Sequence, residues 1–153
     1  MVTDVFGVIL QEIGKNLQVA DLHPDRNNSC LIKLKNGLHV QMEIDRTGQF
    51  LILGSDLGAP PPGRLREALF KEALRANGLP PPRNGIFAYS TRSEHVVIYE
   101  SFNLKDLNGE KVVAVLEPFA EKAFTWKEAI AKGDIPPVHT NANRPAGMFG
   151  LSP

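Results

Sequence analysis

The sequence has little of three things that often define a protein's class: cysteine, an excess of one charge, and long apolar runs. A single cysteine, Cys30, excludes a disulfide framework within one chain. Lysine and arginine together number 17, and so do aspartate and glutamate. This balance gives the chain no net charge that would attract nucleic acid or an anionic membrane.

Long apolar segments are also missing. No run approaches the roughly 18 consecutive apolar residues that a membrane-spanning helix needs. Asp4 and Glu12 interrupt the apolar residues near the start, where a secretory signal would be continuous. We therefore expect a cytoplasmic protein that neither inserts into a membrane nor binds nucleic acid.

Motifs for catalysis, cofactors or metals are absent as well. The four histidines, His23, His39, His95 and His139, do not have the spacing of metal ligands. Gly14-Lys15 lacks the glycine spacing of a phosphate-binding loop, and no orienting carboxylate accompanies Cys30 and His39. We name no catalytic, cofactor-binding or metal-binding residue and expect no enzymatic activity. A small-molecule enzyme, the weakest alternative, would need a polar pocket formed only in space.

Apolar periodicity predicts the elements in the order α-β-β-β-α-β-β-α, an α+β fold with helices packed against a twisted antiparallel sheet. Asn36-Gly37 predicts a two-residue hairpin turn, and Asn108 and Gly133 predict the ends of the last helix. Pro118 should kink or break that helix. The expected ranges are 4–16, 64–77 and 109–132 for the helices and 30–35, 38–45, 49–54, 86–90 and 95–102 for the strands.

One predicted strand and one predicted helix have more apolar surface than a single core needs. Phe50 to Leu53 is apolar on both faces, so it must be covered on both sides, by this chain or by another. In the helix 64–77, Leu65, Leu69 and Ala73 lie on one side, and Phe70 and Leu74 lie about 100° further round. The wider apolar arc indicates a helix buried inside one domain or, as we prefer, a two-fold interface with a second copy.

Residues 1–133 should form a single domain, and the Pro-, Asn- and Gly-rich residues 134–153 a flexible tail. Several motifs resemble the signature of class I type III secretion chaperones, the Tir-chaperone (CesT/SycE-like) family. These motifs are Leu53-Gly54, Leu57-Gly58-Ala59-Pro60-Pro61, Arg66-Glu67-Ala68-Leu69-Phe70, Ala76-Asn77, Gly85-Ile86-Phe87 and the run from Leu116 to Ala123 followed by Trp126. The neutral charge differs from the usually acidic members of that family.

The resemblance implies a homodimeric chaperone in the cytoplasm of a Gram-negative bacterium. It would hold the N-terminal region of a secreted effector in extended form, without ATP or another cofactor, and keep it soluble and ready for export. The implied dimer interface comprises Leu65, Leu69, Phe70, Ala73 and Leu74. The implied cargo-binding residues, on the first helix and the first three strands, are Val5, Phe6, Ile9, Leu10, Leu31, Ile32, Leu34, Phe50 and Ile52.

Alternatives remain open for the partner. A regulatory adaptor of the same fold would bind a secretion-apparatus component, such as the ATPase or a sorting protein, and the chain could pair with a different chaperone instead of with itself. If the helix 64–77 is the interface, Leu69→Glu or Phe70→Glu should give monomers, because each would bury an unpaired charge.

Overall fold

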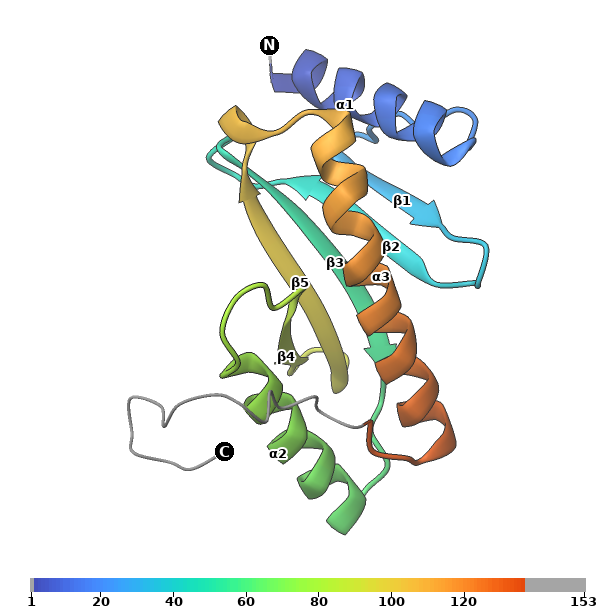
Figure 1. The fold of residues 1–153 in the computed structure, drawn as a ribbon, viewed down its shortest axis with the longest axis vertical. Helices are drawn as coiled ribbons and strands as arrows, with labels where there is room; N and C mark the ends of the chain where they lie inside the picture. The colour runs from blue at the N-terminus through green and yellow to red at the C-terminus, as the bar shows by residue number, and fades with distance from the viewer. Residues whose placement is uncertain (1, 137–153) are drawn as a thin grey trace.

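The computed structural model describes residues 2–136, and the predicted tail lies outside the described residues from position 137 onward. Within these residues the chain forms three α-helices, one short 3-10 helix and five strands in the predicted order, so the α+β fold is confirmed (Figure 1). The bounds are α1 Val2–Leu17, β1 Ser29–Lys33, β2 His39–Ile44, β3 Phe50–Gly58, α2 Arg64–Asn77, β4 Ile86–Ser90, β5 His95–Asn103, η1 Leu104–Asp106 and α3 Gly109–Lys132.

The sheet is antiparallel throughout, with the strand order β1-β2-β3-β5-β4. Alternation along each strand gives it two different faces. On the inner face, α3 crosses β3 and contacts α1, while α2 lies beside β4 (Figure 1). We call the opposite side the outer face, which no helix of the described residues covers.

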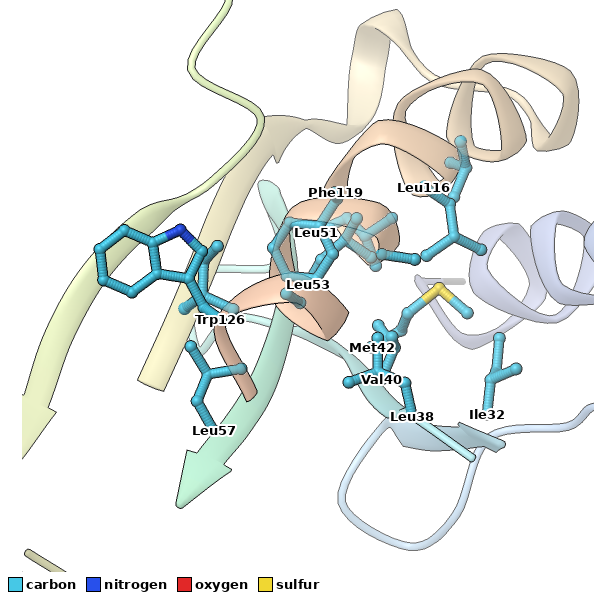
Figure 2. Close-up of a cluster of buried hydrophobic side chains, with 14 of the residues drawn as sticks. Ile32, Leu38, Val40, Met42, Leu51, Leu53, Leu57, Leu116, Phe119 and Trp126 are labelled. Carbon is cyan, nitrogen blue, oxygen red and sulfur yellow. The ribbon is translucent and has the colours of Figure 1, made fainter. Parts of the chain in front are cut away.

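The core lies between the inner face and the helices (Figure 2). Val40, Met42, Leu51 and Leu53 point from the sheet toward α3 and have no exposed surface. Figure 2 also shows Leu116, Phe119 and Trp126 of α3 approaching them from the other side. Alternate residues of β2 and β3 therefore supply one wall of the core and leave their neighbours on the outer face.

Capping residues determine where the long helix α3 begins and ends, as the sequence predicted. The Asn108 side chain accepts a hydrogen bond from the Lys111 N–H, and Gly133 ends the helix with a left-handed φ of 74°. Pro118 was predicted to kink or break this helix, and the helix continues through it without a break. At its start, the Gly109 N–H donates to the Glu12 carboxylate of α1, and a Cβ at Gly109 would overlap that side chain.

The structure corrects two predictions about the first strands. The Leu34 N–H donates to the Leu38 carbonyl, so the β1–β2 hairpin has a three-residue loop instead of a two-residue turn, with Gly37 at a φ of 88°. β3 does not end at Gly54 but continues to Gly58, because Ser55 and Asp56 still pair with β5. An interior glycine weakens a strand without ending it when both neighbouring strands supply hydrogen bonds.

Two aspartates, the exposed Asp25 and the half-buried Asp45, bind the main chain of the turns beside β1 and β3. The pKa of Asp45 lies below its usual range, chiefly because its carboxylate accepts from the Thr47 hydroxyl and also from the Gln49 and Phe50 N–H groups. The pKa of Asp25 is likewise lowered, first by the Ser29 N–H and then by the Ser29 hydroxyl. Both groups stabilise the fold more as carboxylates than as acids.

This arrangement predicts acid sensitivity. A lowered pKa in the folded chain means that the stabilisation is complete above the unfolded pKa of about 3.9 and is lost as the pH falls from there through the lower folded pKa. Asp45→Asn should therefore shrink the difference between the thermal unfolding midpoints at neutral and at acidic pH. The control is Glu117→Gln, at an exposed carboxylate of α3. An unchanged pH difference in Asp45→Asn would contradict the assignment.

Candidate functional site

The outer face is the first candidate surface, and one row of residues crosses it from edge to edge. The strand register aligns Leu31 with Gln41, Gln41 with Gly54, Gly54 with Tyr99 and Tyr99 with Ile86. Leu31 is 61% exposed and Tyr99 41% exposed. Exposed apolar side chains in such a row favour a protein partner over solvent.

A hollow of about 430 Å³ lies on this face, with Gly54 in its floor. Its apolar lining comes from Leu31 and Ile52 at one side and from Val97 and Tyr99 of β5 at the other. Its polar lining includes His39, Gln41, Glu43 and Asp56, so the lining has two carboxylates and no lysine or arginine. The hollow therefore suits an apolar group that has positive charge beside it.

Asp56 and His95 meet at one end of the outer face. His95 Nδ1 lies 2.9 Å from both carboxylate oxygens of Asp56. Burial opposes the charged form, but the hydrogen bonds from His95 and from the Gly58 N–H outweigh it and lower the pKa of Asp56. Asp56 therefore stays ionised at neutral pH.

The second candidate surface is the free edge of β1. The Ile44 N–H donates to the Asn28 carbonyl, and the Leu34 N–H donates to the Leu38 carbonyl. These two bonds show which residue pairs along β1 and β2 are hydrogen-bonded to each other. In an antiparallel ladder these pairs alternate, so the main-chain groups of Leu31 and Lys33 point away from β2. No partner among the described residues binds them, which leaves two donors and two acceptors open.

Other parts of the sheet edges are closed. The outward main-chain groups of Ser29 bind Asp25, with the Asp25 N–H donating to the Ser29 carbonyl at 2.8 Å. On the opposite edge, the Asn77 side chain of α2 accepts from the Phe87 N–H and donates to the Phe87 carbonyl. A partner strand therefore finds more open hydrogen-bonding groups at Leu31 and Lys33 than at Phe87.

The third candidate surface lies on α2 and β4. Leu74 of α2 is 71% exposed, the largest exposed fraction among the large apolar side chains of residues 5–136. Phe70 packs edge-on against Tyr89 of β4, with the ring centroids 5.5 Å apart. We call Phe70, Leu74 and Tyr89 the α2–β4 patch.

Lys122 of α3 holds the loop that joins α2 to β4. Its Nζ donates to the Arg83 carbonyl at 2.7 Å and to the Gly85 carbonyl at 2.9 Å, and it lies 4.9 Å from the centre of the Phe87 ring. Desolvation lowers the pKa of this lysine. The contact ties the α2–β4 patch to the core of the molecule.

The structure divides the predicted cargo-binding residues into two sets. Val5, Leu31 and Phe50 are exposed, and Leu34 and Ile52 are half-buried. Four others belong to the core, namely Phe6, Ile9, Leu10 and Ile32, with at most 3% of their surface exposed. Side chains buried in this way cannot contact a second chain in this conformation, so only the first set enters the proposed surface.

The predicted interface residues divide in the same way. Leu69 and Ala73 are buried beneath α2, and Leu65 is half-buried with its side chain toward Gly133. Phe70 is half-buried and Leu74 is exposed, which fits their predicted place about 100° further round the helix than Leu69 and Ala73. Tyr89, Val97, Tyr99 and Lys122 were not predicted from sequence, although the alternation of Val97 and Tyr99 along β5 was a usable signal.

The residues considered for catalysis, Cys30 and His39, lie on opposite faces of the sheet. Cys30 lies on the inner face opposite Met42, whereas His39 lies on the outer face opposite Lys33. Burial raises the pKa of the Cys30 thiol, which disfavours the reactive thiolate. Within residues 2–136, no cluster of His, Cys, Asp and Glu has the makings of a metal site. No helix in this part of the chain has the length and apolar character to span a membrane.

Several solved structures of low sequence identity share this fold. The Yersinia pestis type III secretion chaperone SycH, solved with a fragment of YscM2, has a TM-score of 0.64 and 16% identity, covering 79% of this chain and 98% of that one. SchA in the HopA1–SchA chaperone–effector complex gives 0.67 and 17%, covering 82% and 94%. The ExoU–SpcU complex of Pseudomonas aeruginosa gives 0.64 and 12%, covering 81% and 98%.

No curated protein sequence is similar enough to count as a match. The model of the Tir chaperone protein (CesT) family, in contrast, matches residues 8–127, well over half of the chain. The predicted resemblance is therefore confirmed, and this chain belongs to the Tir chaperone protein (CesT) family.

Proposed function

We propose that this protein is a cytoplasmic type III secretion chaperone that binds the N-terminal region of a secreted effector in extended form and keeps it competent for export. The observation that carries the proposal is the open edge of β1, where the outward main-chain groups of Leu31 and Lys33 have no partner among the described residues. The protein acts by binding and needs no catalytic group.

An extended cargo segment would add a strand beside β1. Each new main-chain hydrogen bond contributes about 0.5–1.5 kcal/mol net, independently of the cargo sequence. Apolar contacts with Leu31 on the outer face, and with Leu34 near the hairpin, would add selectivity. This division suits a chaperone that must accept segments of differing sequence.

The α2–β4 patch supports a homodimer. A two-fold axis near Leu74 would bring the same patch of two copies together, because such interfaces are self-complementary. Burying Leu74 and Phe70 on each copy contributes about 1.5–3 kcal/mol per side chain. The sheet edge at β1 lies away from this patch, so the dimer would leave it accessible (Figure 1).

Co-expression with N-terminal fragments of effectors secreted by the same bacterium tests the function. We expect a stable complex of two chaperone chains with one fragment, measured by light scattering. Hydrogen exchange should show new protection of the Leu31 and Lys33 amides. A partner bound only as a folded domain, or an apparatus component bound in place of every fragment, would contradict the proposal and favour the regulatory adaptor.

A further inference from the structure

A second apolar cavity lies on the helical side of the sheet, between α3 and the β1–β2 hairpin. The hairpin extends past α3 on the side away from β5 (Figure 1), and α3 packs mainly against α1 and β3, so a gap remains beside the hairpin. The larger part of this gap measures about 330 Å³ and the smaller part about 160 Å³. Phe124 and Asn36 line both parts, which therefore form one continuous groove. We call it the α3–hairpin groove, and its apolar lining is Leu17, Leu34, Leu38, Leu116, Ala120 and Phe124.

One side of α3 supplies much of this apolar lining. Leu116, Ala120 and Phe124 follow one another at intervals of four residues, so they form a row with a spacing of about 6 Å along the helix. Phe119 and Trp126 point from another side of the same helix into the core (Figure 2). Phe124 is a large apolar side chain, yet it is only half-buried. A segment that covered this row would remove apolar surface from water, which favours docking.

The rim of the α3–hairpin groove carries negative charge. Glu117 and Glu121 line the larger part and are both exposed, and among residues 2–136 no lysine or arginine lines that part. Lys127 and Glu128 both line the smaller part, where their charges offset each other. The groove as a whole therefore fits an apolar segment that carries positive charge.

The chain itself contains such a segment outside the described residues. Within 137–153, three large apolar residues fall within four positions, Met148, Phe149 and Leu151, and we call them the tail cluster. Arg144 precedes the tail cluster by four residues, and 137–153 contains neither aspartate nor glutamate. A short apolar cluster with a positive charge close by is the combination that the larger part of the groove fits.

The groove also lies within reach of this segment. Ala131, which lines the smaller part, comes one residue before the end of α3, and Leu116 at the far end of the groove lies about 22 Å from it along the helix axis. Residues 137–148 span up to about 40 Å when extended, which is enough to turn back beside α3 and reach the larger part. Attachment to the same chain gives the segment an effective concentration of about millimolar, which favours it over a separate molecule.

We propose that residues 144–153 dock in the α3–hairpin groove of their own chain. The tail cluster covers the apolar row that ends at Phe124, and Arg144 lies beside the carboxylates of the rim. The inference goes beyond the proposed function, because it concerns the chain with no cargo bound. A docked segment keeps an apolar groove covered and so limits the association of further copies through it.

A spin label next to the tail cluster tests the position of the segment in the full chain. Ser152→Cys supplies the thiol for the label, while the native Cys30 is buried and unreactive by comparison. We expect the label to broaden the nuclear magnetic resonance signals of the Leu34 and Phe124 amides and to leave that of Tyr89 unchanged. A second sample combines isotope-labelled chains without a spin label and spin-labelled chains without the isotope, after subunit exchange. We expect no broadening in this mixed sample, because docking is within one chain.

Variants of the spin-labelled chain test which side chains dock. Phe149→Ser removes the largest side chain of the tail cluster, so it should lower the docking equilibrium constant by about tenfold or more and reduce the broadening. Arg144→Glu should act in the same direction, because it places a negative charge beside the carboxylates of the rim. The matched control, Val138→Ser, removes an apolar side chain from 137–153 outside the tail cluster and should leave the broadening unchanged.

Four outcomes would overturn the proposal. They are no broadening at Leu34 and Phe124, broadening at Tyr89 in their place, equal broadening with Phe149→Ser or Arg144→Glu, and broadening in the mixed sample, which would make the tail of a second copy the occupant. Each of these leaves the capture of effector fragments intact. Failure of the proposed function, in contrast, would appear as unchanged protein that captures no fragment.

Discussion

Leu74→Glu should convert the proposed dimer into a folded monomer. Leu74 is 71% exposed in the single chain, so a carboxylate there stays hydrated and leaves the fold undisturbed. In the dimer the same carboxylate would be buried without a partner, and the two-fold axis would place a second one near it. We expect the dimer dissociation constant to rise by at least about a hundredfold, as measured by analytical ultracentrifugation.

Two further variants test whether the loss of the dimer is specific to position 74. Arg64→Glu also introduces a negative charge at an exposed position of α2, but ten residues before Leu74, or about 15 Å along the helix axis, and should remain dimeric. Leu69→Glu, which the sequence suggested as a dimer-breaking change, should unfold the chain instead, because Leu69 is 1% exposed within one copy. A Leu74→Glu protein that is still dimeric would place the interface elsewhere.

Leu31→Pro should abolish strand addition while the sheet remains intact. The Leu31 N–H points away from β2, so proline removes no hydrogen bond of the fold. It does remove a donor from the open edge, places a ring in the path of the cargo strand, and deletes an apolar side chain that is 61% exposed. With several hydrogen bonds of about 0.5–1.5 kcal/mol each at stake, we expect affinity for an effector fragment to fall by about a hundredfold.

A control variant separates the contribution of the Leu31 main chain to binding from that of its side chain. Leu31→Ser removes the apolar contact but keeps the N–H, and should weaken binding by less than about tenfold. Calorimetric titration with the same effector fragment gives both affinities, and circular dichroism confirms that each variant is folded. If Leu31→Pro binds as tightly as the unchanged chain, the cargo does not add a strand at β1.

Local chemistry made parts of this structure predictable from sequence. The ends of α3 follow from Asn108 and Gly133, because an N-cap side chain and a left-handed glycine act within one helical turn. The bounds of α2 follow from the glycine before it and from Asn77-Gly78 after it. The separation of Leu69 from Leu74 on this helix follows from 3.6 residues per turn.

Pattern alone did not determine which apolar side chains remain exposed. Phe6 and Val5 are adjacent apolar residues on α1, yet Phe6 has no exposed surface and Val5 is 48% exposed. Which side of α1 faces inward depends on the position of α3, which Glu12 contacts at Gly109. Such a contact between residues far apart in sequence has no local signal.

The sequence by itself determined the order of the elements, the two sides of α2 and the excess of apolar surface on β3, because these depend on periods of two and 3.6 residues. The tertiary structure decided that all three described α-helices lie on one face, that Asn77 binds the outward main-chain groups of Phe87 on β4, and that Leu31 and Lys33 remain open at β1. It also showed that Gly54, which the sequence predicted at the end of a strand, lies inside β3 in the floor of a hollow. The reason is that edges, faces and hollows exist only after strands distant in sequence have paired, and their register sets which groups remain without a partner.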